Sequence, residues 1–385
     1  MTANASAARF APRMARLREV LAARGCDAFL ADHAELIAWI SGYTVSETLY
    51  RAVIVPMDGD PCFVLRSIDA GPCRSGVWFD EVETFDDHED PQGAVANALA
   101  ARGLGGARIG ADPMSYGHTA ATAQRLGELL PDARFVPLPG LSDTLRACKF
   151  ADEIDAIAAA AAIADQCMLG LEGHVPPGRT VREVAAAAAA AQLWLGADDG
   201  GPGPILVSGG YRNGSQGNGS HVDFLHGSGL DRTLMPGDIL HAELTPPVGN
   251  YGARLMRPVF VGDPPAGARE TFRQLAELQD RQIAAMRPGA AARDVDALLR
   301  TAVLDAGLRT DYGNVTGYAM GLYARTPRPS DFSQSFHSGA DFELQPGQVF
   351  HMYASARGVA VSETVLVTEG APRLLTTCPR RPIEG

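Results

Sequence analysis

The residues that could carry covalent or metal chemistry do not form the common short motifs. The six cysteines include no Cys-x-x-Cys pair, which excludes the usual structural zinc and dithiol redox motifs. A glycine-rich segment at 208–220 lacks the Gly-Lys-Ser/Thr ending of a phosphate loop, so we expect a surface loop or a lid beside a site. Forty-five acidic residues and nine histidines leave metal coordination and acid–base catalysis open, to be tested position by position.

The composition is that of an ordinary globular protein. The chain has 385 residues, 46% hydrophobic and 20% charged, which is enough for two or three domains. Its formal charge of -12 disfavours nucleic-acid and anionic-membrane partners, which require clustered Lys and Arg. The first twenty residues lack a signal-peptide pattern, and the alanine-rich runs at 156–164 and 185–191 are too short to span a membrane. We therefore expect a cytoplasmic protein with free thiols.

Helix and strand patterns alternate over the first 140 residues. The hydrophobic spacing predicts helices at 14–24, 94–102 and 120–130. Short apolar runs bounded by turn residues predict strands at 28–31, 51–56, 61–65, 107–111 and 133–137. This alternation predicts a three-layer α/β domain over residues 1–145.

The pattern changes at about Leu145. A long alanine-rich helix is predicted at 151–172, and Thr180-Val-Arg-Glu183 is a capping box that begins the next helix. Strands are predicted at 204–208, 238–244, 257–261, 348–353 and 359–367, and further helices at 268–286 and 293–306. Helix pairs and antiparallel strands thus recur in two blocks, which predicts an α+β domain over 146–385 with an internal pseudo-repeat.

Several segments in this order resemble one family. Arg146-Ala-Cys-Lys-Phe-Ala-Asp-Glu-Ile154, Pro236-Gly-Asp-Ile-Leu240, Pro346-Gly-Gln-Val-Phe350 and Glu363-Thr-Val-Leu-Val-Thr368 resemble the signatures of the pita-bread catalytic domain of creatinase, prolidase and aminopeptidase P. Ile37-Ala-Trp-Ile-Ser-Gly-Tyr43 is similar to the amino-terminal domain that accompanies it. The resemblance implies a creatinase-type amino-terminal domain followed by a pita-bread domain.

The resemblance also locates the family's metal ligands. Its peptidase members bind two cations through two Asp, one His and two Glu, and such a pair of cations can activate water. In this sequence the five positions hold Glu243, Arg254, Tyr318, Tyr353 and Ser362. Arginine stays protonated and cannot ligate a cation. The resemblance therefore implies a chain without a metal centre and without a cofactor.

Without the metal ligands, the sequence resembles the metal-free branch of the family. Creatinase and ectoine hydrolase belong to that branch, and ectoine hydrolase is the more similar of the two. That branch hydrolyses C–N bonds of small zwitterionic molecules, so the resemblance implies His226, Glu243 and Glu363 as catalytic residues. We expect the two glutamates to face one pocket from neighbouring strands. One would be a general base, its pKa raised by burial and by the other carboxylate, and the other acid or His226 would protonate the leaving nitrogen.

The resemblance implies substrate-binding residues in the same pocket. Arg254 could hold a substrate carboxylate or form an ion pair with either glutamate. Tyr318 and Tyr353 could orient the substrate through their hydroxyls or pack as buried aromatic rings.

A homodimer is expected from the resemblance, because in creatinase-like dimers an arginine of the partner's amino-terminal domain reaches the active site. Arg51 is the candidate, against the alternative of a solvated charge at a strand edge. Arg325, and more weakly Arg328, could meet the same substrate carboxylate.

Three other functions stay open. The fold favours a metallopeptidase acting on Xaa-Pro bonds, which most of the ligand positions oppose. A lyase would need a base but no incoming water. A non-catalytic binding protein would fit the loss of metal ligands, but the glutamates and the histidine favour catalysis.

Overall fold

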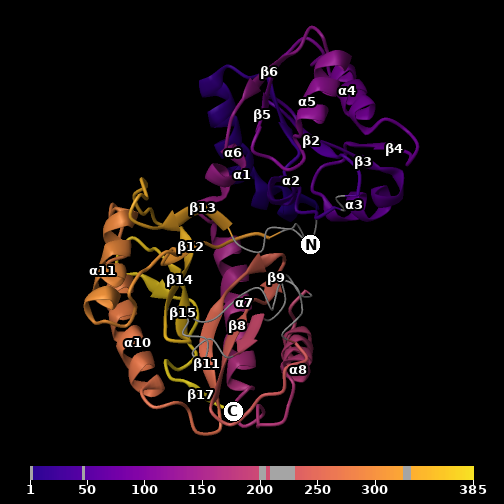
Figure 1. Ribbon diagram of the computed structural model, residues 1–385. Helices are drawn as coiled ribbons and strands as arrows, with labels where there is room; N and C mark the ends of the chain where they lie inside the picture. The colour runs from indigo at the N-terminus through magenta and orange to yellow at the C-terminus, as the bar shows by residue number, and fades with distance from the viewer. Residues whose placement is uncertain (1–2, 46–47, 199–204, 209–229, 324–330) are drawn as a thin grey trace. The chain divides into compact units, whose positions relative to one another are not determined.

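Two units follow one another along the chain in the computed structural model (Figure 1), which describes residues 3–45, 48–198, 205–208, 230–323 and 331–385. The first is Met1–Arg146 and the second is Ala147–Gly385. The division lies one residue after the boundary that the sequence predicts. None of the helices formed by these described residues is long and apolar enough to cross a membrane.

The first unit is built around a six-stranded sheet in the order β4-β3-β2-β1-β5-β6. Its strands are β1 Ala28–Ala31, β2 Ala52–Pro56, β3 Cys62–Arg66, β4 Val82–Phe85, β5 Arg108–Ala111 and β6 Arg134–Pro137. Its helices are α1 Ala3–Arg24, α2 Ala34–Ser41, the 3-10 turn η1 Ser67–Asp69, α3 Ala70–Gly76, α4 Pro91–Ala101, α5 Ala120–Leu129 and α6 Leu141–Arg146. Strand β1 pairs antiparallel with β2 and parallel with β5, as expected for a mixed α/β domain.

The described residues of the second unit form two larger sheets and two helix pairs. The helices are α7 Ala151–Leu169, α8 Val181–Trp194, α10 Ala268–Ala284 and α11 Ala292–Asp305. One sheet has the order β17-β11-β8-β7, with β7 Ile205–Ser208, β8 Asp238–Leu244, β11 Leu255–Val261 and β17 Ile383–Glu384. The other has the order β13-β12-β14-β15-β16, with β12 Gly317–Ala319, β13 Asp331–Phe336, β14 Val349–Ala356, β15 Val359–Leu366 and β16 Arg373–Leu374. A small pair, β9 Pro247–Val248 and β10 Tyr251–Gly252, lies between β8 and β11 in the sequence.

Each helix pair covers one sheet. Apolar residues of α7 and α8 pack on Leu240, Ala242 and Leu244 of β8, whereas α10 and α11 pack on β14 and β15. In Figure 1 the strands accordingly lie between α10 and α11 on one side and α7 and α8 on the other. Because side chains alternate along a strand, the remaining face of each sheet points away from its helices, and we call these the inner faces.

The two blocks of the second unit repeat the same local structure. Gly237 and Gly347 each follow a proline, have φ of 83° and 85°, and donate their N–H to the carbonyls of Val261 and Val367. This left-handed conformation favours glycine and starts β8 and β14 alike. The isolated bridges Thr180↔Thr233 and Ala291↔Glu343 also correspond, since each joins the residue before the second helix of a pair to the segment that leads into β8 or β14. The predicted pseudo-repeat is confirmed at this level.

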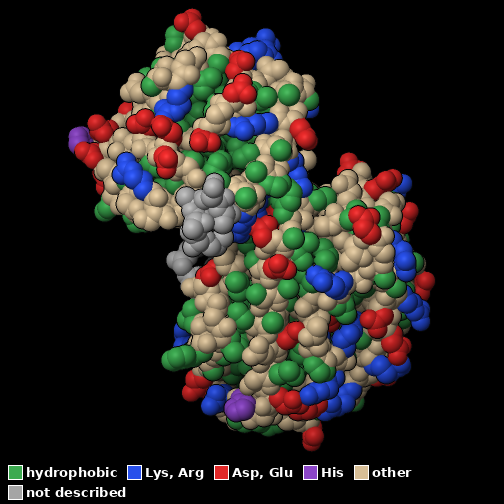
Figure 2. All heavy atoms as spheres, turned by 180° about the vertical axis from the view of Figure 1, so that it is seen from behind, with side chains coloured by type: hydrophobic (Ala, Val, Ile, Leu, Met, Phe, Trp, Pro, Cys, Tyr) green, Lys and Arg blue, Asp and Glu red, His purple; other side chains and the backbone are tan. Residues whose placement is uncertain are grey.

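The surface face in Figure 2 carries acidic and basic side chains that alternate over short distances, with apolar side chains between them. Among the coloured residues of that face, Lys and Arg do not gather into one stripe.

Candidate active site

The inner face of β8 carries a buried ion pair. Arg254, the residue before β11, donates from Nη1 to Glu243 Oε1 over 2.8 Å. The same Nη1 donates to the hydroxyl of Tyr318 on β12 over 2.9 Å, and the guanidinium carbon lies 5.5 Å from the ring centroid. All three side chains are at most 4% exposed. Three of the five positions that the sequence resemblance assigns to metal ligands are therefore in direct contact, and the arginine joins the other two.

Three aromatic rings adjoin this pair. Tyr318 is paired in register with His351 on β14, and Tyr353 lies two residues further along the same face. The ring centroid of His351 is 5.0 Å from that of Tyr318 and 5.4 Å from that of Tyr353, edge-on to the first and stacked on the second. Asn314 donates to the hydroxyl of Tyr353 over 3.1 Å, which fixes the direction of that hydroxyl.

The carboxylate of Glu243 is held in its charged form. Burial acts to raise its pKa, but Arg254, then His241 and His351, outweigh this and bring the pKa below its ordinary value. Nε2 of His241 lies 3.6 Å from the second carboxylate oxygen. The predicted rise in the pKa of Glu243 is therefore wrong, because its partner is a cation and not a second carboxylate.

The rings beside the pair are uncharged. Burial, assisted by the charge of Arg254, lowers the pKa of His351 to about 3 although Glu243 acts in the opposite direction. Burial also raises the pKa of Tyr318 and of Tyr353 above the ordinary value. At neutral pH Glu243 is thus a carboxylate, Arg254 a guanidinium, His351 a neutral imidazole, and Tyr318 and Tyr353 are phenols.

Ser362, at the family's fifth ligand position, joins the two sheets. Its hydroxyl accepts from the backbone N–H of Met256 over 2.7 Å. Two residues along, Thr364 Oγ1 accepts from the N–H of Arg254 over 2.9 Å and donates to the Arg254 carbonyl over 2.8 Å. These contacts tie β15 to the segment that positions Arg254.

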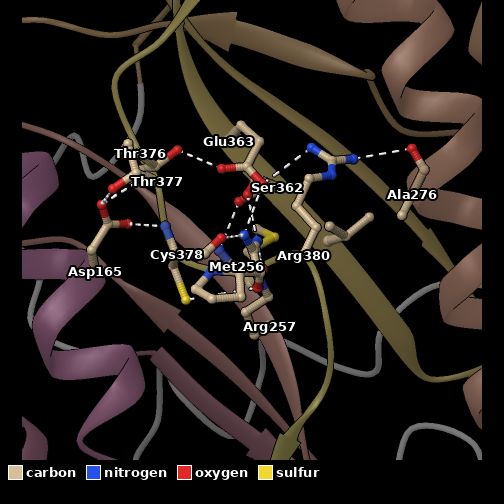
Figure 3. Close-up of polar contacts among 12 residues, drawn as sticks. Asp165, Met256, Arg257, Ala276, Ser362, Glu363, Thr376, Thr377, Cys378 and Arg380 are labelled. Carbon is tan, nitrogen blue, oxygen red and sulfur yellow. Dashed lines mark hydrogen bonds and ion pairs between the residues drawn. The ribbon is translucent and has the colours of Figure 1, made fainter.

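Glu363 lies on the opposite face of β15 from Ser362, with its side chain directed toward the outer side of the sheet. It is paired in register with Met352, which packs on the helix side of β14. Its carboxylate accepts from Arg257 at 2.8 Å, from Arg380 at 3.1 Å and from the hydroxyl of Thr376, the contacts drawn as dashed lines in Figure 3. Ser362 shares the inner face with Tyr353, and the next residue along the strand, Glu363, points to the opposite face. The expectation that Glu243 and Glu363 face one pocket is therefore wrong.

The contacts of Glu363 belong to a buried network between the two halves of the unit. Arg380 also donates to the carbonyl of Ala276 on α10, at 3.0 Å. Asp165 on α7 accepts from the backbone N–H groups of Thr377 and Cys378 at 2.7 and 3.0 Å (Figure 3). The segment 376–380 therefore connects the α7 side to the α10 side, which indicates a structural role for Glu363.

The other predicted residues belong to undescribed segments or to the first unit. His226, Arg325 and Arg328 lie outside the described residues, as does most of the glycine-rich segment at 208–220. Arg51 belongs to the first unit, where it is 4% exposed and donates to the carbonyl of Asp32 over 3.2 Å. It is therefore not a solvated strand-edge charge in this chain, and its role toward a partner stays a prediction.

Two histidines of the site were not predicted as site residues. His241 and His351 lie two residues before Glu243 and Tyr353, at equivalent places of the repeat. Side chains two residues apart on a strand point to the same face, so each histidine shares the inner face with Glu243 or Tyr353. The same alternation could therefore have identified both histidines from the sequence.

Comparison with known proteins decides the family. Residues 155–369 match the model of metallopeptidase family M24, and residues 13–148 match the creatinase/prolidase N-terminal domain. The chain belongs to the M24 family. It is a hydrolase of that family, and the fold expected from the resemblance is confirmed.

Relatives of this M24 hydrolase include dipeptidases and an ectoine hydrolase. A probable dipeptidase PepE of Mycobacterium tuberculosis is 28% identical over 87% of this chain and 86% of its own length. The ectoine hydrolase of Halomonas elongata is 24% identical over 97% and 96%. The crystal structure of a dipeptidase from Pyrococcus horikoshii superimposes with a TM-score of 0.80 at 21% identity, covering 97% of this chain and 100% of that one.

The five ligand positions of the M24 hydrolase do not fit a pair of cations. Only Glu243 is an acid, and it is ion-paired with Arg254. Tyr318 and Tyr353 are held as neutral phenols, and the Ser362 hydroxyl is engaged by a backbone N–H. Within the described parts of the chain, no three His, Cys, Asp or Glu side chains are grouped so that they could hold a metal ion. A fixed guanidinium among these positions would repel a cation.

Proposed function

We propose that this M24 hydrolase cleaves a C–N bond, of the amide or amidine type, in a small zwitterionic substrate without a metal ion. The observation that carries the proposal is the ion pair of Arg254 with Glu243 at two positions where the family's peptidases have metal ligands. A positive charge is still supplied at that place, but by a guanidinium and not by a cation.

Glu243 is the proposed general base. It would take a proton from water, the water oxygen would attack the carbon of the C–N bond, and the proton would pass to the leaving nitrogen. In the chain without substrate, Arg254 lowers the pKa of Glu243 and makes it a weak base. A substrate carboxylate that pairs with Arg254 would offset this charge, and the pKa of Glu243 would then rise toward a useful value.

Arg254 and the two tyrosines would bind the substrate. The guanidinium can hold a carboxylate by two parallel hydrogen bonds, which matches the acidic half of a zwitterion. Tyr318 contacts Arg254, and its ring centroid lies 6.0 Å from that of Tyr353; an aromatic ring attracts a cationic or delocalised amidinium group of a substrate. The similarity to ectoine hydrolase over 97% of the chain supports this class of substrate.

A metal-dependent dipeptidase is the second candidate, and the similarity to the dipeptidase PepE favours it. It requires cations to be bound by residues other than those at the five family positions, or by a rearranged Glu243 and Arg254. The donor set of the described residues speaks against it, whereas the family membership speaks for it.

The test is turnover of a small panel by the purified protein in ¹⁸O-labelled water with no metal added. The panel is ectoine as a cyclic amidine, creatine as a guanidino acid, an N-acetyl diamino acid and alanyl-proline. We expect cleavage of one of the first three with one ¹⁸O atom in the product. Cleavage of alanyl-proline alone would support the dipeptidase, and a product without ¹⁸O would indicate a lyase.

The homodimer, with Arg51 of one chain near the site of the other, remains part of the proposal. The opposing evidence is that Arg51 is buried within its own unit. Mixing Arg51→Ala and Glu243→Gln chains tests it: if Arg51 acts across a dimer, mixed dimers regain part of the activity that each variant lacks alone. No regained activity would remove Arg51 from the site.

A further inference from the structure

His351 is fully buried on the inner face of β14, yet neither of its ring nitrogens has a hydrogen-bond partner among the described residues. Its ring contacts are with Tyr318 and Tyr353, whose hydroxyls are directed to Arg254 and Asn314. Buried polar atoms without a partner are uncommon in folded proteins, and each one needs a physical explanation.

A packing role does not explain this residue. An unsatisfied buried polar atom destabilises the folded state, whereas a phenylalanine would offer the same edge-on and stacked contacts without two unpaired nitrogens. The neighbouring strand positions satisfy their polar groups, as Thr364 does with Arg254. The unpartnered imidazole of His351 therefore lies among the residues to which we assign substrate binding and catalysis.

The surroundings of the imidazole fix its chemical character. Glu243, Arg254 and His241 all influence its protonation, and burial dominates, so the ring is neutral at physiological pH. A neutral imidazole has one N–H donor and one acceptor nitrogen. It can therefore meet two polar atoms of opposite hydrogen-bonding character without adding a charge to the site.

We propose that His351 is a substrate-contacting residue that donates one hydrogen bond to, and accepts another from, the polar atoms around the scissile C–N group. The inference rests on the proposed function and deepens it. The substrate must offer both an acceptor and an N–H or O–H donor near the bond that breaks. Amides and cyclic amidines meet this requirement. A bound substrate would supply the hydrogen bonds that the ring lacks in the chain alone.

Two variants separate this role from packing. His351→Phe keeps an aromatic ring and removes both nitrogens, and His351→Asn keeps one donor and one acceptor. His174→Phe, at an exposed position of the same unit, is the matched control. With the compound that the wild type cleaves, we expect His351→Phe to lose kcat/KM by at least about tenfold, because the substrate's polar atoms are left unpaired. His351→Asn should recover part of this loss, and His174→Phe should show none.

The second readout observes the ring nitrogens of the wild-type protein directly. In wild-type protein labelled with ¹⁵N-histidine, the His351 signals should shift when one of the four panel compounds is added to saturation, since new hydrogen bonds change the shielding of both nitrogens. Folded His351→Asn assigns the signals by their disappearance. No shift with any of the four compounds overturns the inference.

The two proposals can fail separately. Metal-free cleavage by the wild type that persists unchanged in a folded His351→Phe variant overturns the role of His351 and leaves the proposed function standing. No metal-free cleavage by the wild type, together with a shift of the His351 signals, overturns the proposed function and supports the contact. If the His351 signals of the wild type shift but kcat/KM is unchanged in His351→Phe, the contact with the ligand does not contribute to turnover, and that part of the proposal is wrong.

Discussion

Glu243 and Glu363 provide a matched pair of variants, because the same substitution removes one buried carboxylate from each face of the same unit. Glu243→Gln removes the negative charge that pairs with Arg254 at 2.8 Å, and Glu363→Gln removes the one that pairs with Arg257 at 2.8 Å. Both arginines are at most 3% exposed. Breaking a buried ion pair on one side costs about 3–5 kcal/mol, because the remaining charge stays buried.

The expected thermal effect is similar for the two variants. For a unit of this size, about 1 kcal/mol lowers Tm by roughly 2–4 °C, so each variant should unfold roughly 6–20 °C below the wild type. Differential scanning calorimetry measures this. A variant of Glu363 with an unchanged Tm would contradict the network of Figure 3, in which Arg257, Arg380 and Thr376 share this one carboxylate.

The expected effects on activity differ. Loss of a general base lowers kcat by roughly 10²–10⁴-fold, so Glu243→Gln should be close to inactive. Glu363→Gln should keep kcat within about threefold at a temperature where it is folded. The assay is steady-state turnover of the compound that the wild type cleaves, normalised to folded protein. Equal losses of kcat in both variants would refute the placement of the site on one face.

Three further outcomes are expected. The pKa of His351 is lowered to about 3, whereas the unfolded residue titrates near about 6.5, so the unfolded chain binds a proton first as the pH falls. The free energy of unfolding should therefore fall by roughly 2 kcal/mol between pH 7 and pH 5, and urea titrations of His351→Phe should lack this part of the fall. In Gly317→Ala the added Cβ would overlap Met352, so we expect the free energy of unfolding to fall by about 1–3 kcal/mol and turnover to fall with it. Gly313→Ala is the control and should change neither, because a Cβ at that position has no atom within 4 Å beyond its chain neighbours. Asp165→Ala removes a carboxylate that accepts from two backbone N–H groups, and limited proteolysis should cut the last ten residues faster than in the wild type.

The sequence predicts most of the fold because its local signals agree with the tertiary structure. The capping box at Thr180 and Glu183 forms as expected, and α8 starts at the next residue. The strand β1 has the predicted bounds of 28–31. Elements with weak periodicity, such as β12 with three residues and β4 with exposed side chains, were not predicted, because pairing with neighbouring strands and not local pattern determines them.

The site was predictable where the repeat sets the register. Glu243 and Tyr353 each lie six residues after a strand-opening glycine, and the structure places both on inner faces. Glu363 was misplaced by one residue, since Ser362 occupies the inner position and a shift of one reverses the face. The ion pair of Arg254 with Glu243 was one of the two alternatives that the sequence left open, whereas the raised pKa of Glu243 was expected from a second carboxylate that faces the other way.

The central claim is that Arg254 and Glu243 replace the family's metal centre, and the activity of one exhaustively chelated sample tests it most directly. Metal content is measured on that sample by mass spectrometry, and turnover of the panel compound is measured before and after adding Mn²⁺, Co²⁺ or Zn²⁺. We expect full turnover with far less than one metal ion per chain and no increase when a metal is added. Activity that disappears with the metal and returns with it would show that cations, and not Arg254 and Glu243 alone, form the active centre.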